Sequence, residues 1–334
     1  MNYVVQPISG FAWDASIKPR YDVGYFMEKA GWTIYRMPMF NQLSAKDSEH
    51  YIHEFSLKLS QGDNVLWQTP SYESYAPYEA DFIKVAHDKG AKVIALVHDV
   101  DYLRGLSGDV AQLPGFLSKF DCLITSSEAM SKILRQWGTS TKMVEREPWD
   151  YYVPGGIAPK SYSRDLWYAG NLAAWKTSFL DAFPDQLKIN VFGSNPENRT
   201  FPKNVQLQGE AGNDILPTKL GNGFGLVWDG NQDKQNDNKY GTYLKYNWSH
   251  KLSAYLAAGI PIIAWKESHG YEYVKAHQIG IGIDSLQELP EKLNSVTPDQ
   301  YNEMVNRIAP LAHKVRSGNY IKEATSKALD VLAY

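Results

Sequence analysis

The sequence SHKLSAYLAAGIPIIAW, residues 249–265, predicts a capped short helix, a break at Gly259-Ile260-Pro261 and then a buried strand. His250 and Lys251 fall in the first turn of this helix, where the helix dipole disfavours positive charge. An anion docked there would reverse that penalty, although the dipole contributes only about 0.3–1 kcal/mol. On this stretch alone, an anion site and a tolerated exposed lysine are both open.

Length and composition indicate a two-domain protein without a membrane span. The 334 residues exceed what one core usually supports, and 43% of them are hydrophobic. A net charge of -3 argues against a protein that coats nucleic acid or an anionic membrane. The single cysteine, Cys122, cannot form an intramolecular disulfide, and no charged leader or apolar run of about 18 residues is found. We therefore expect a cytoplasmic protein.

Short apolar runs alternate with amphipathic segments along the chain, a pattern typical of α/β folds with parallel sheets. In the first half, this pattern predicts strands over 1–8, 32–37, 64–68, 92–97 and 120–125, and helices over roughly 20–30, 77–89 and 127–138. In the second half, it predicts strands over 166–169, 188–192, 205–208, 225–228 and 262–265, another near 281, and a helix over roughly 174–183.

Two breaks complete this organisation. The breaker-rich stretch between Glu147 and Pro159 is the predicted linker, and the last helical region, roughly 298–333, is expected to be interrupted at Pro310. The architecture expected is two consecutive doubly wound sheets with a long C-terminal helix. Ligands of such sheets bind outside the carboxyl ends of the strands, and here also between the two domains.

Asp99-Val100-Asp101 follows the predicted strand 92–97 and has three interpretations. The spacing is one by which some sugar-nucleotide enzymes chelate a divalent metal. The position also allows a carboxylate, or His98, to act as a general base without metal. The third interpretation is that these residues cap the next turn. We favour the base over the metal, because Lys251 and Lys176 are alternative partners for a pyrophosphate.

A glycine turn, Gly170-Asn171, follows the predicted strand 166–169 and would let a ligand approach the backbone closely. One glycine is not a dinucleotide-binding fingerprint. Lys176 lies near the start of the following helix, where it either reaches a phosphate or is solvated. The polar loop at roughly 231–242 indicates either a lid that orders on ligand binding or plain surface loop.

Five segments in order resemble one family of bacterial GT-B glycosyltransferases, and the resemblance covers nearly the whole chain. The segments are VHDV (97–100), ITSSEAM (124–130), LWYAGNL (166–172), GFGLVWDG (223–230) and YLKYNWSHKLSAYLAAGIP (243–261). This family resembles the enzymes that extend the first GlcNAc on serine-rich repeat adhesins, and it is similar to β-1,6-galactofuranosyltransferases. The resemblance implies a UDP-sugar donor, no metal requirement, a cytoplasmic location and a homo-oligomer, commonly a tetramer.

The resemblance also implies a domain plan. A Rossmann-like acceptor domain would span 1–155 and a Rossmann-like nucleotide-sugar domain 156–312, facing each other across a cleft. A crossover helix, 313–334, would return toward the N-terminal domain. No nucleic acid and no membrane insertion are implied.

Site residues are carried over by position. Lys251 would hold the pyrophosphate with help from Lys176, and the loop Gly10 to Ser16 would face the sugar and the acceptor. Ser249 stands where the family is expected to have proline. The residues that the resemblance assigns to the UDP-sugar are Lys251, Lys176, His250, Asn247, Tyr246, Gly170, Asn171, Ser16 and Gly10.

The stereochemistry expected is inversion. Retaining GT-B enzymes often carry a Glu-x7-Glu pair, and Ala254 stands where its second glutamate would fall. An inverting displacement needs a base on the acceptor and a stabiliser for the departing UDP. The lysines 251 and 176 are the expected stabilisers. The candidate bases are Asp99, Asp101, His98 and Asp14.

The function that this reasoning favours is a UDP-sugar-dependent hexosyltransferase that moves glucose, or alternatively GlcNAc, onto a GlcNAc-modified serine-rich repeat adhesin. One alternative is a nucleotide-sugar epimerase or synthetase, which the missing Gly-x-Gly-x-x-Gly fingerprint disfavours. A second alternative is a non-catalytic scaffold subunit of a glycosylation complex.

Overall fold

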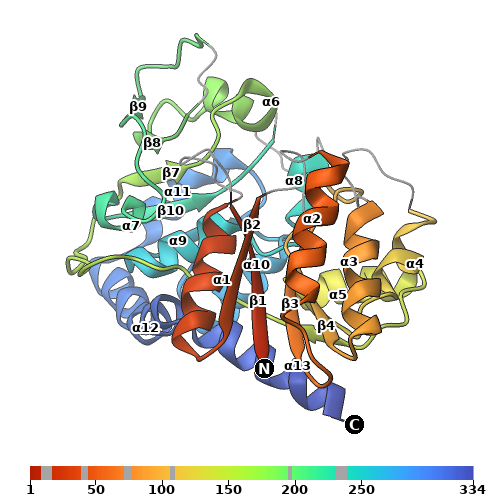
Figure 1. Cartoon of the computed structure of the whole chain (residues 1–334). Coiled ribbons are helices and arrows are strands. Elements are labelled where there is room, and N and C mark those ends of the chain that lie inside the picture. Colours follow the sequence, from red (N-terminus) through yellow and green to blue (C-terminus); the bar gives the residue numbers. More distant parts are fainter. Residues whose placement is uncertain are drawn as a thin grey trace. The chain divides into compact units, whose positions relative to one another are not determined.

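The chain folds into two compact units (Figure 1). The computed structural model describes residues 1–8, 17–38, 44–70, 77–105, 110–194, 198–230 and 239–333. Unit 1 is Met1–Asp150 together with Gly318–Tyr334, and unit 2 is Tyr151–Ser317. The sequence analysis places these divisions at 155/156 and 312/313. The C-terminal helix belongs to unit 1, as expected.

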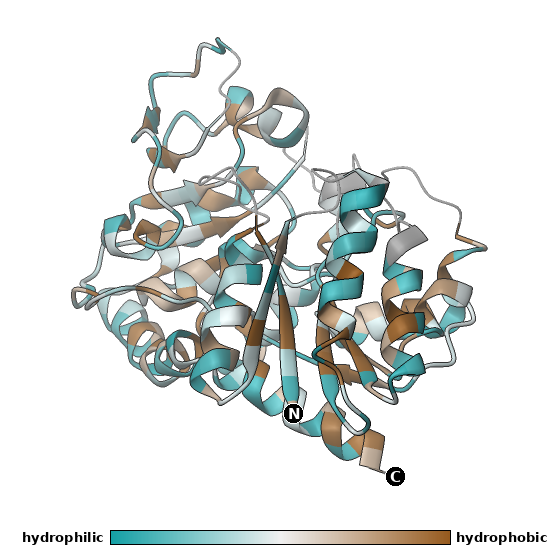
Figure 2. Cartoon of the chain, in the orientation of Figure 1, coloured by the Kyte–Doolittle hydropathy of each residue, from teal (hydrophilic) through white to brown (hydrophobic). Residues whose placement is uncertain are grey.

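Unit 1 is built on a six-stranded sheet in the order β2-β1-β3-β4-β5-β6, in which every pairing is parallel. Its central strands are buried almost completely, as expected for a parallel sheet covered on both faces. Figure 2 shows that the core strands are largely hydrophobic, whereas α2 is mostly hydrophilic. The strands are β1 (Asn2–Ile8), β2 (Thr33–Pro38), β3 (Asn64–Thr69), β4 (Lys92–Val97), β5 (Cys122–Thr125) and β6 (Met143–Glu145).

The helices of unit 1 connect these strands, and the last one comes from the far end of the chain. They are α1 (Lys18–Lys29), α2 (Ala45–Ser56), α3 (Pro77–Asp88), α4 (Leu113–Leu117), α5 (Glu128–Gln136) and α13 (Asn319–Ala333). Helix α13 packs against α1, β5 and β6. Ser127 caps α5, since its side chain accepts a hydrogen bond from the backbone nitrogen of Met130.

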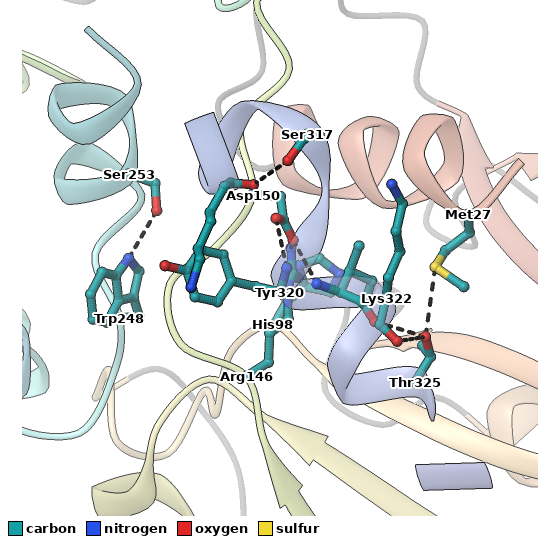
Figure 3. A network of polar contacts seen from close by, with 12 residues as sticks. Met27, His98, Arg146, Asp150, Trp248, Ser253, Ser317, Tyr320, Lys322 and Thr325 are labelled. Atoms are coloured by element: carbon teal, nitrogen blue, oxygen red, sulfur yellow. Dashed lines mark hydrogen bonds and ion pairs between the residues drawn. The ribbon is translucent and has the colours of Figure 1, made fainter. Parts of the chain in front are cut away.

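One buried carboxylate attaches α13 to unit 1. Asp150 accepts hydrogen bonds from the backbone nitrogens of Tyr320 (3.1 Å) and Ile321 (2.7 Å), so it caps the helix from a distant segment. Arg146 donates to the same carboxylate at 2.9 Å, and neither side chain is exposed (Figure 3). The guanidinium also lies over the ring of Trp149, 4.2 Å from its centroid. The caps and the ion pair together satisfy the buried charge of Asp150.

The prediction that the last helical region is interrupted at Pro310 is wrong. Pro310 lies inside α12 (Pro298–Ser317), on its exposed face, where water can satisfy the carbonyl that proline leaves without a donor. The chain breaks instead at Gly318, whose φ of +74° favours glycine. A Cβ there would also lie 2.4 Å from the ring of Phe26. Residues 313–317 therefore belong to α12, and the crossover helix begins after Gly318.

Unit 2 has a second all-parallel sheet of six strands, in the order β12-β11-β10-β7-β8-β9. The strands are β7 (Leu166–Ala169), β8 (Ile189–Phe192), β9 (Val205–Leu207), β10 (Phe224–Val227), β11 (Ile262–Trp265) and β12 (Gly280–Ile283). The predicted α/β architecture with two doubly wound sheets is confirmed. Strand order reverses between β1 and β3 in unit 1 and between β7 and β10 in unit 2. Such switch points are where open parallel sheets bind ligands.

The helices of unit 2 are short apart from α12. They are α6 (Ala174–Thr177), the 3-10 helix η2 (Ser178–Ala182), α7 (Leu216–Lys219), α8 (Lys239–Tyr243), α9 (His250–Ala258), α10 (His269–His277), the 3-10 helix η4 (Leu286–Glu288) and α11 (Leu289–Ser295). The helix expected over 174–183 is thus one α-helical turn followed by η2. Among the described residues, no helix is long and apolar enough to cross a membrane.

We predict that Asp150→Asn lowers the free energy of unfolding by about 3–5 kcal/mol, because it leaves the buried charge of Arg146 uncompensated. Chemical denaturation followed by circular dichroism measures this change. The matched control is Asp88→Asn. Asp88 pairs with Lys84 at the same i,i+4 spacing but on the surface, so it should change stability by less than about 1 kcal/mol. Equal effects of the two substitutions would contradict the role given to Asp150.

Candidate active site

The switch point of unit 2 brings together the turns that follow β7 and β10. Gly170 and Asn171 follow β7, and Asn171 closes its turn by accepting a hydrogen bond from the backbone nitrogen of Ala173 at 2.9 Å. Asp229 and Gly230 follow β10, and the nitrogen of Gly230 donates to the carbonyl of Lys176 at 2.8 Å. That last bond joins α6 to the β10 turn, so both turns and α6 form one edge.

Helix α9 is held over this switch point by Tyr255. The Tyr255 hydroxyl accepts from the backbone nitrogen of Ala169 (3.2 Å), at the end of β7, and donates to the carbonyl of Leu226 (3.1 Å) in β10. The ring fits because residue 225 is glycine, where a Cβ would lie 2.3 Å from the Tyr255 ring. The N-terminus of α9 is thereby fixed relative to the ends of β7 and β10.

The ends of α9 agree with the sequence in part. Gly259 ends the helix in the left-handed region (φ +76°), as the Gly-x-Pro break predicts. Ser249 occupies the N-cap position, but its side chain caps no backbone nitrogen, so the predicted serine cap is wrong. The segment before the helix is tied down instead by the indole nitrogen of Trp248, which donates to the Ser253 hydroxyl at 2.9 Å.

Lys251 is mostly buried in the first turn of α9 and is paired with a carboxylate of the same unit. Its ammonium lies 2.8 and 3.0 Å from the two oxygens of Asp229, and the Tyr168 hydroxyl donates to Asp229 at 3.1 Å. The Lys251 and Asp229 side chains are 11% and 10% exposed. The alternative of an exposed lysine is therefore wrong. Asp229 supplies the negative charge that the helix dipole and the buried lysine require.

The surroundings of Lys251 have opposing effects on its pKa. Burial lowers the pKa of Lys251, and the nearby charge of Lys176 lowers it further, whereas Asp229 raises it. Burial and Asp229 also raise the pKa of Tyr168, so its hydroxyl keeps its proton and remains a donor to Asp229. A Cβ on Gly170 would lie 3.2 Å from Cε of Lys251 and from the Tyr168 hydroxyl. Glycine at this turn thus lets the lysine pass close to the backbone.

Lys176 is carried by α6, which is held in place by Arg199. The Arg199 guanidinium donates to the carbonyls of Leu172 (2.6 Å) and Thr177 (3.1 Å), to the Thr177 hydroxyl (2.9 Å) and to Asp181 (2.8 Å). Sequence reasoning missed both Arg199 and Asp229. Asp229 has a detectable signal, since it is the first acidic residue after the predicted strand 225–228, but Arg199 has none.

The segment that leads into α9 contains the other predicted donor residues. The ring of His250 stacks on Tyr151 with centroids 4.8 Å apart, and the Tyr151 hydroxyl donates to the carbonyl of Asn213. Asn247 has a buried side-chain oxygen that accepts no hydrogen bond from the described residues. Tyr246 is half-buried beside it. Unit 2 therefore places Lys251, Lys176, Gly170 and Asn171 at one edge, with Asn247, Tyr246 and His250 adjoining Lys251 in the chain.

In unit 1, His98 follows β4 in a fixed orientation. Its Nε2 lies 2.9 Å from the side-chain oxygen of Gln68, and its ring stacks on Trp149. The Gln68 amide nitrogen donates to the carbonyls of Val5 and Arg20, which identifies the other amide atom as the oxygen. Nε2 of His98 must therefore carry a proton, and the lone pair of the neutral ring is on Nδ1.

Asp99 and Asp101 share a guanidinium. Nη1 of Arg104 lies 3.4 Å from Asp99 and 3.5 Å from Asp101. Burial raises the pKa of Asp101 and the charge of Asp99 adds to this effect, while Arg104 opposes it. Among the described residues, no group of three or more His, Cys, Asp or Glu side chains is arranged to hold a metal ion. Asp14, Ser16 and Gly10 lie outside the described residues, as does 231–238 of the predicted lid.

The geometry of the two units agrees with comparisons to known proteins. The N-terminal and C-terminal domain models of the Glucosyltransferase 3-like family match residues 1–148 and 166–328. The chain belongs to this family of GT-B glycosyltransferases. The two matches leave out only the region around the linker, 149–165, and the last residues, 329–334.

Curated relatives are similar over most of their length. The β-1,6-galactofuranosyltransferase WbbI of Escherichia coli is 28% identical over 72% of this chain and 72% of its own. Glucosyltransferase 3 of Streptococcus gordonii is 27% identical over 80% of this chain and 79% of its own.

Solved structures share the fold at lower identity. Anabaena HepE, in complex with UDP and glucose, is 12% identical with a TM-score of 0.64, and the match covers 99% of both chains. The pneumococcal O-GlcNAc transferase GtfA, in complex with UDP and GlcNAc, is 15% identical with a TM-score of 0.53 over 84% of this chain. This chain spans only 60% of the length of GtfA. These similarities support the GT-B fold.

We predict that Tyr255→Phe lowers the free energy of unfolding by about 1–3 kcal/mol, because the Ala169 nitrogen and the Leu226 carbonyl both lose a buried partner. Chemical denaturation measures the loss. Tyr102→Phe is the control, because Tyr102 is 47% exposed and its substitution should change stability by less than about 0.5 kcal/mol. A Tyr255→Phe variant as stable as the native chain would show that this hydroxyl does not fix α9.

Proposed function

We propose that this glycosyltransferase moves glucose, or alternatively GlcNAc, from a UDP-sugar onto a GlcNAc-modified serine-rich repeat adhesin, with inversion at the anomeric carbon. The observation that carries the proposal is Lys251, a buried cation in the first turn of α9, packed against the glycine turn at a sheet switch point. Helix N-termini and such turns bind phosphate groups. The similarity to glucosyltransferase 3 and to solved structures that contain UDP supports the donor class.

The donor half of the reaction belongs to unit 2. When the glycosidic bond to UDP breaks, negative charge develops on the β-phosphate oxygen, and preorganised cations that face this oxygen lower the barrier. Lys251 would stabilise that charge and Lys176 would add a second cation from α6. Asn247 has a buried acceptor oxygen that suits an N–H or O–H group of the nucleotide. These residues would let the donor react without a metal ion.

The acceptor half needs a base that removes the hydroxyl proton. Among the described candidates we propose Asp99, which has the most exposed side chain, 30% against 14% for Asp101. Nη1 of Arg104 lies 3.4 Å from this carboxylate and would orient it. His98 is held by Gln68 through Nε2 and by stacking on Trp149, so we assign it to shaping the same turn.

We propose a cytoplasmic homotetramer, on the basis of the family resemblance. Light scattering of the purified chain would test the tetramer.

We predict that Lys251→Ala weakens UDP binding by about 10–100-fold, because it removes a charged hydrogen bond worth roughly 1.5–3 kcal/mol and leaves Asp229 facing the phosphates. Isothermal titration calorimetry with UDP measures the change. The control is Lys203→Ala, which removes an exposed lysine of the same unit and should leave the affinity unchanged. UDP binding that is equal in the two variants would contradict the donor site.

Transfer is tested with a GlcNAc-modified serine peptide and a panel of UDP-sugars, each assayed with and without EDTA. We expect transfer of glucose or GlcNAc that survives EDTA, with a product of inverted configuration by NMR. Asp99→Asn should abolish transfer and keep UDP affinity. Transfer that is lost with EDTA would contradict the metal-free donor site. No detectable transfer with any donor and acceptor would favour a non-catalytic scaffold subunit.

A further inference from the structure

We propose that Asp229 is a positioning residue that acts through Lys251. Its carboxylate, itself oriented by Tyr168, fixes the ammonium against the Gly170 turn, so that Lys251 meets the donor diphosphate already charged and in place. The inference rests on the proposed donor site and adds a residue that the sequence analysis did not assign.

The carboxylate of Asp229 is held in a fixed position against Lys251. Both carboxylate oxygens contact the Lys251 ammonium, and one of them also accepts the Tyr168 hydroxyl. Tyr168 is wholly buried in β7, so it constrains the carboxylate from the neighbouring strand. The next residue, Gly230, is bonded to the carbonyl of Lys176. The side chain of Asp229 is therefore held from β7, and its backbone turn is tied to α6.

Lys251 requires this support because its surroundings otherwise disfavour its charge. It lies at the positive end of the α9 dipole, it is mostly buried, and Lys176 repels it. The described titratable groups around it are Asp229, Tyr168 and Lys176, with His250 before it and Tyr255 one turn later on α9. Asp229 is the only negative charge in that set of described groups.

The pair does not prevent phosphate binding. An ammonium has three N–H donors, and the two oxygens of Asp229 account for at most two of them. A diphosphate at the Gly170 turn can accept the third. Asp229 would thus act in the free enzyme as the partner that keeps Lys251 charged, and in the donor complex as the support behind it.

The sign of the pH effect follows from the pair. The negative charge of Asp229 raises the pKa of Lys251, so Asp229→Asn removes this effect and the ammonium loses its proton at a lower pH than in the native chain. A neutral lysine holds a diphosphate less well. The alkaline loss of UDP affinity should therefore begin at a lower pH in Asp229→Asn.

The test measures UDP binding by calorimetry from pH 6 to pH 10 for the native chain, Asp229→Asn, Asp229→Glu and the exposed control Asp185→Asn. We expect Asp229→Asn to bind UDP about tenfold more weakly than the native chain at pH 9, and within about threefold at pH 6, because a lysine that has lost its proton gives up its charged hydrogen bond to the diphosphate. Asp229→Glu should recover part of the affinity, and Asp185→Asn should match the native chain at every pH.

A second measurement follows Lys251 without any ligand. In the chain labelled with 13C at lysine Cε, the Lys251 signal, assigned by its loss in Lys251→Arg, should titrate at a lower pH in Asp229→Asn than in the native chain. Circular dichroism verifies that each variant is folded, and Tyr168→Phe should give a smaller shift in the same direction.

The outcomes separate the two proposals. If Asp229→Asn and the native chain have parallel UDP profiles, or if the variant binds UDP more tightly at every pH, the positioning role is overturned. Tighter binding would identify Asp229 as a competitor of the phosphate. If the native chain binds no UDP, the proposed donor is wrong, and the NMR titration alone decides whether Asp229 keeps Lys251 charged. An unfolded Asp229→Asn would leave the decision to Asp229→Glu and Tyr168→Phe.

Discussion

The candidate donor site depends on the ion pair between Lys251 and Asp229. A buried ammonium at the start of a helix is costly, and the chain compensates with a carboxylate from the end of β10 and a tyrosine hydroxyl from β7. The pairing is possible only because α9 is fixed over the switch point by Tyr255 and because Gly225 leaves room for its ring. The ion pair of the candidate donor site thus depends on the position of α9.

Unit 1 uses a similar device for a structural purpose. Asp150 is buried with Arg146 and caps α13, so an ion pair holds the last helix of the chain to the first sheet. The carboxyl end of β4 in the same unit carries His98 and the two aspartates that share Arg104. Both units therefore place charged side chains after strand ends, beside groups of opposite charge. Lys251 and Asp229 come from different elements, whereas Asp99, Asp101 and Arg104 share one loop.

Sequence patterns predict the periodic elements better than the pairings. The apolar runs identify most strands of both sheets, and Gly259 ends α9 where the Gly-x-Pro break indicates. The three-residue strand Met143–Glu145 is not predicted, although Val205–Leu207, of the same length, is. Pro310 is tolerated because it faces water. The site residues at strand ends follow from the same logic. Asp229 also follows a strand end, but its pairing with Lys251 could not be predicted, since the two residues are 22 positions apart and contact over that separation depends on the tertiary fold.

The central claim is that the first turn of α9 and the Gly170 turn form the diphosphate site of the donor. A crystal structure of the complex with UDP tests it most directly. We expect the β-phosphate within hydrogen-bond distance of Nζ of Lys251, beside the Gly170 backbone, with the ion pair to Asp229 retained. A UDP molecule bound elsewhere, or phosphates that make no contact with Lys251, would contradict the account.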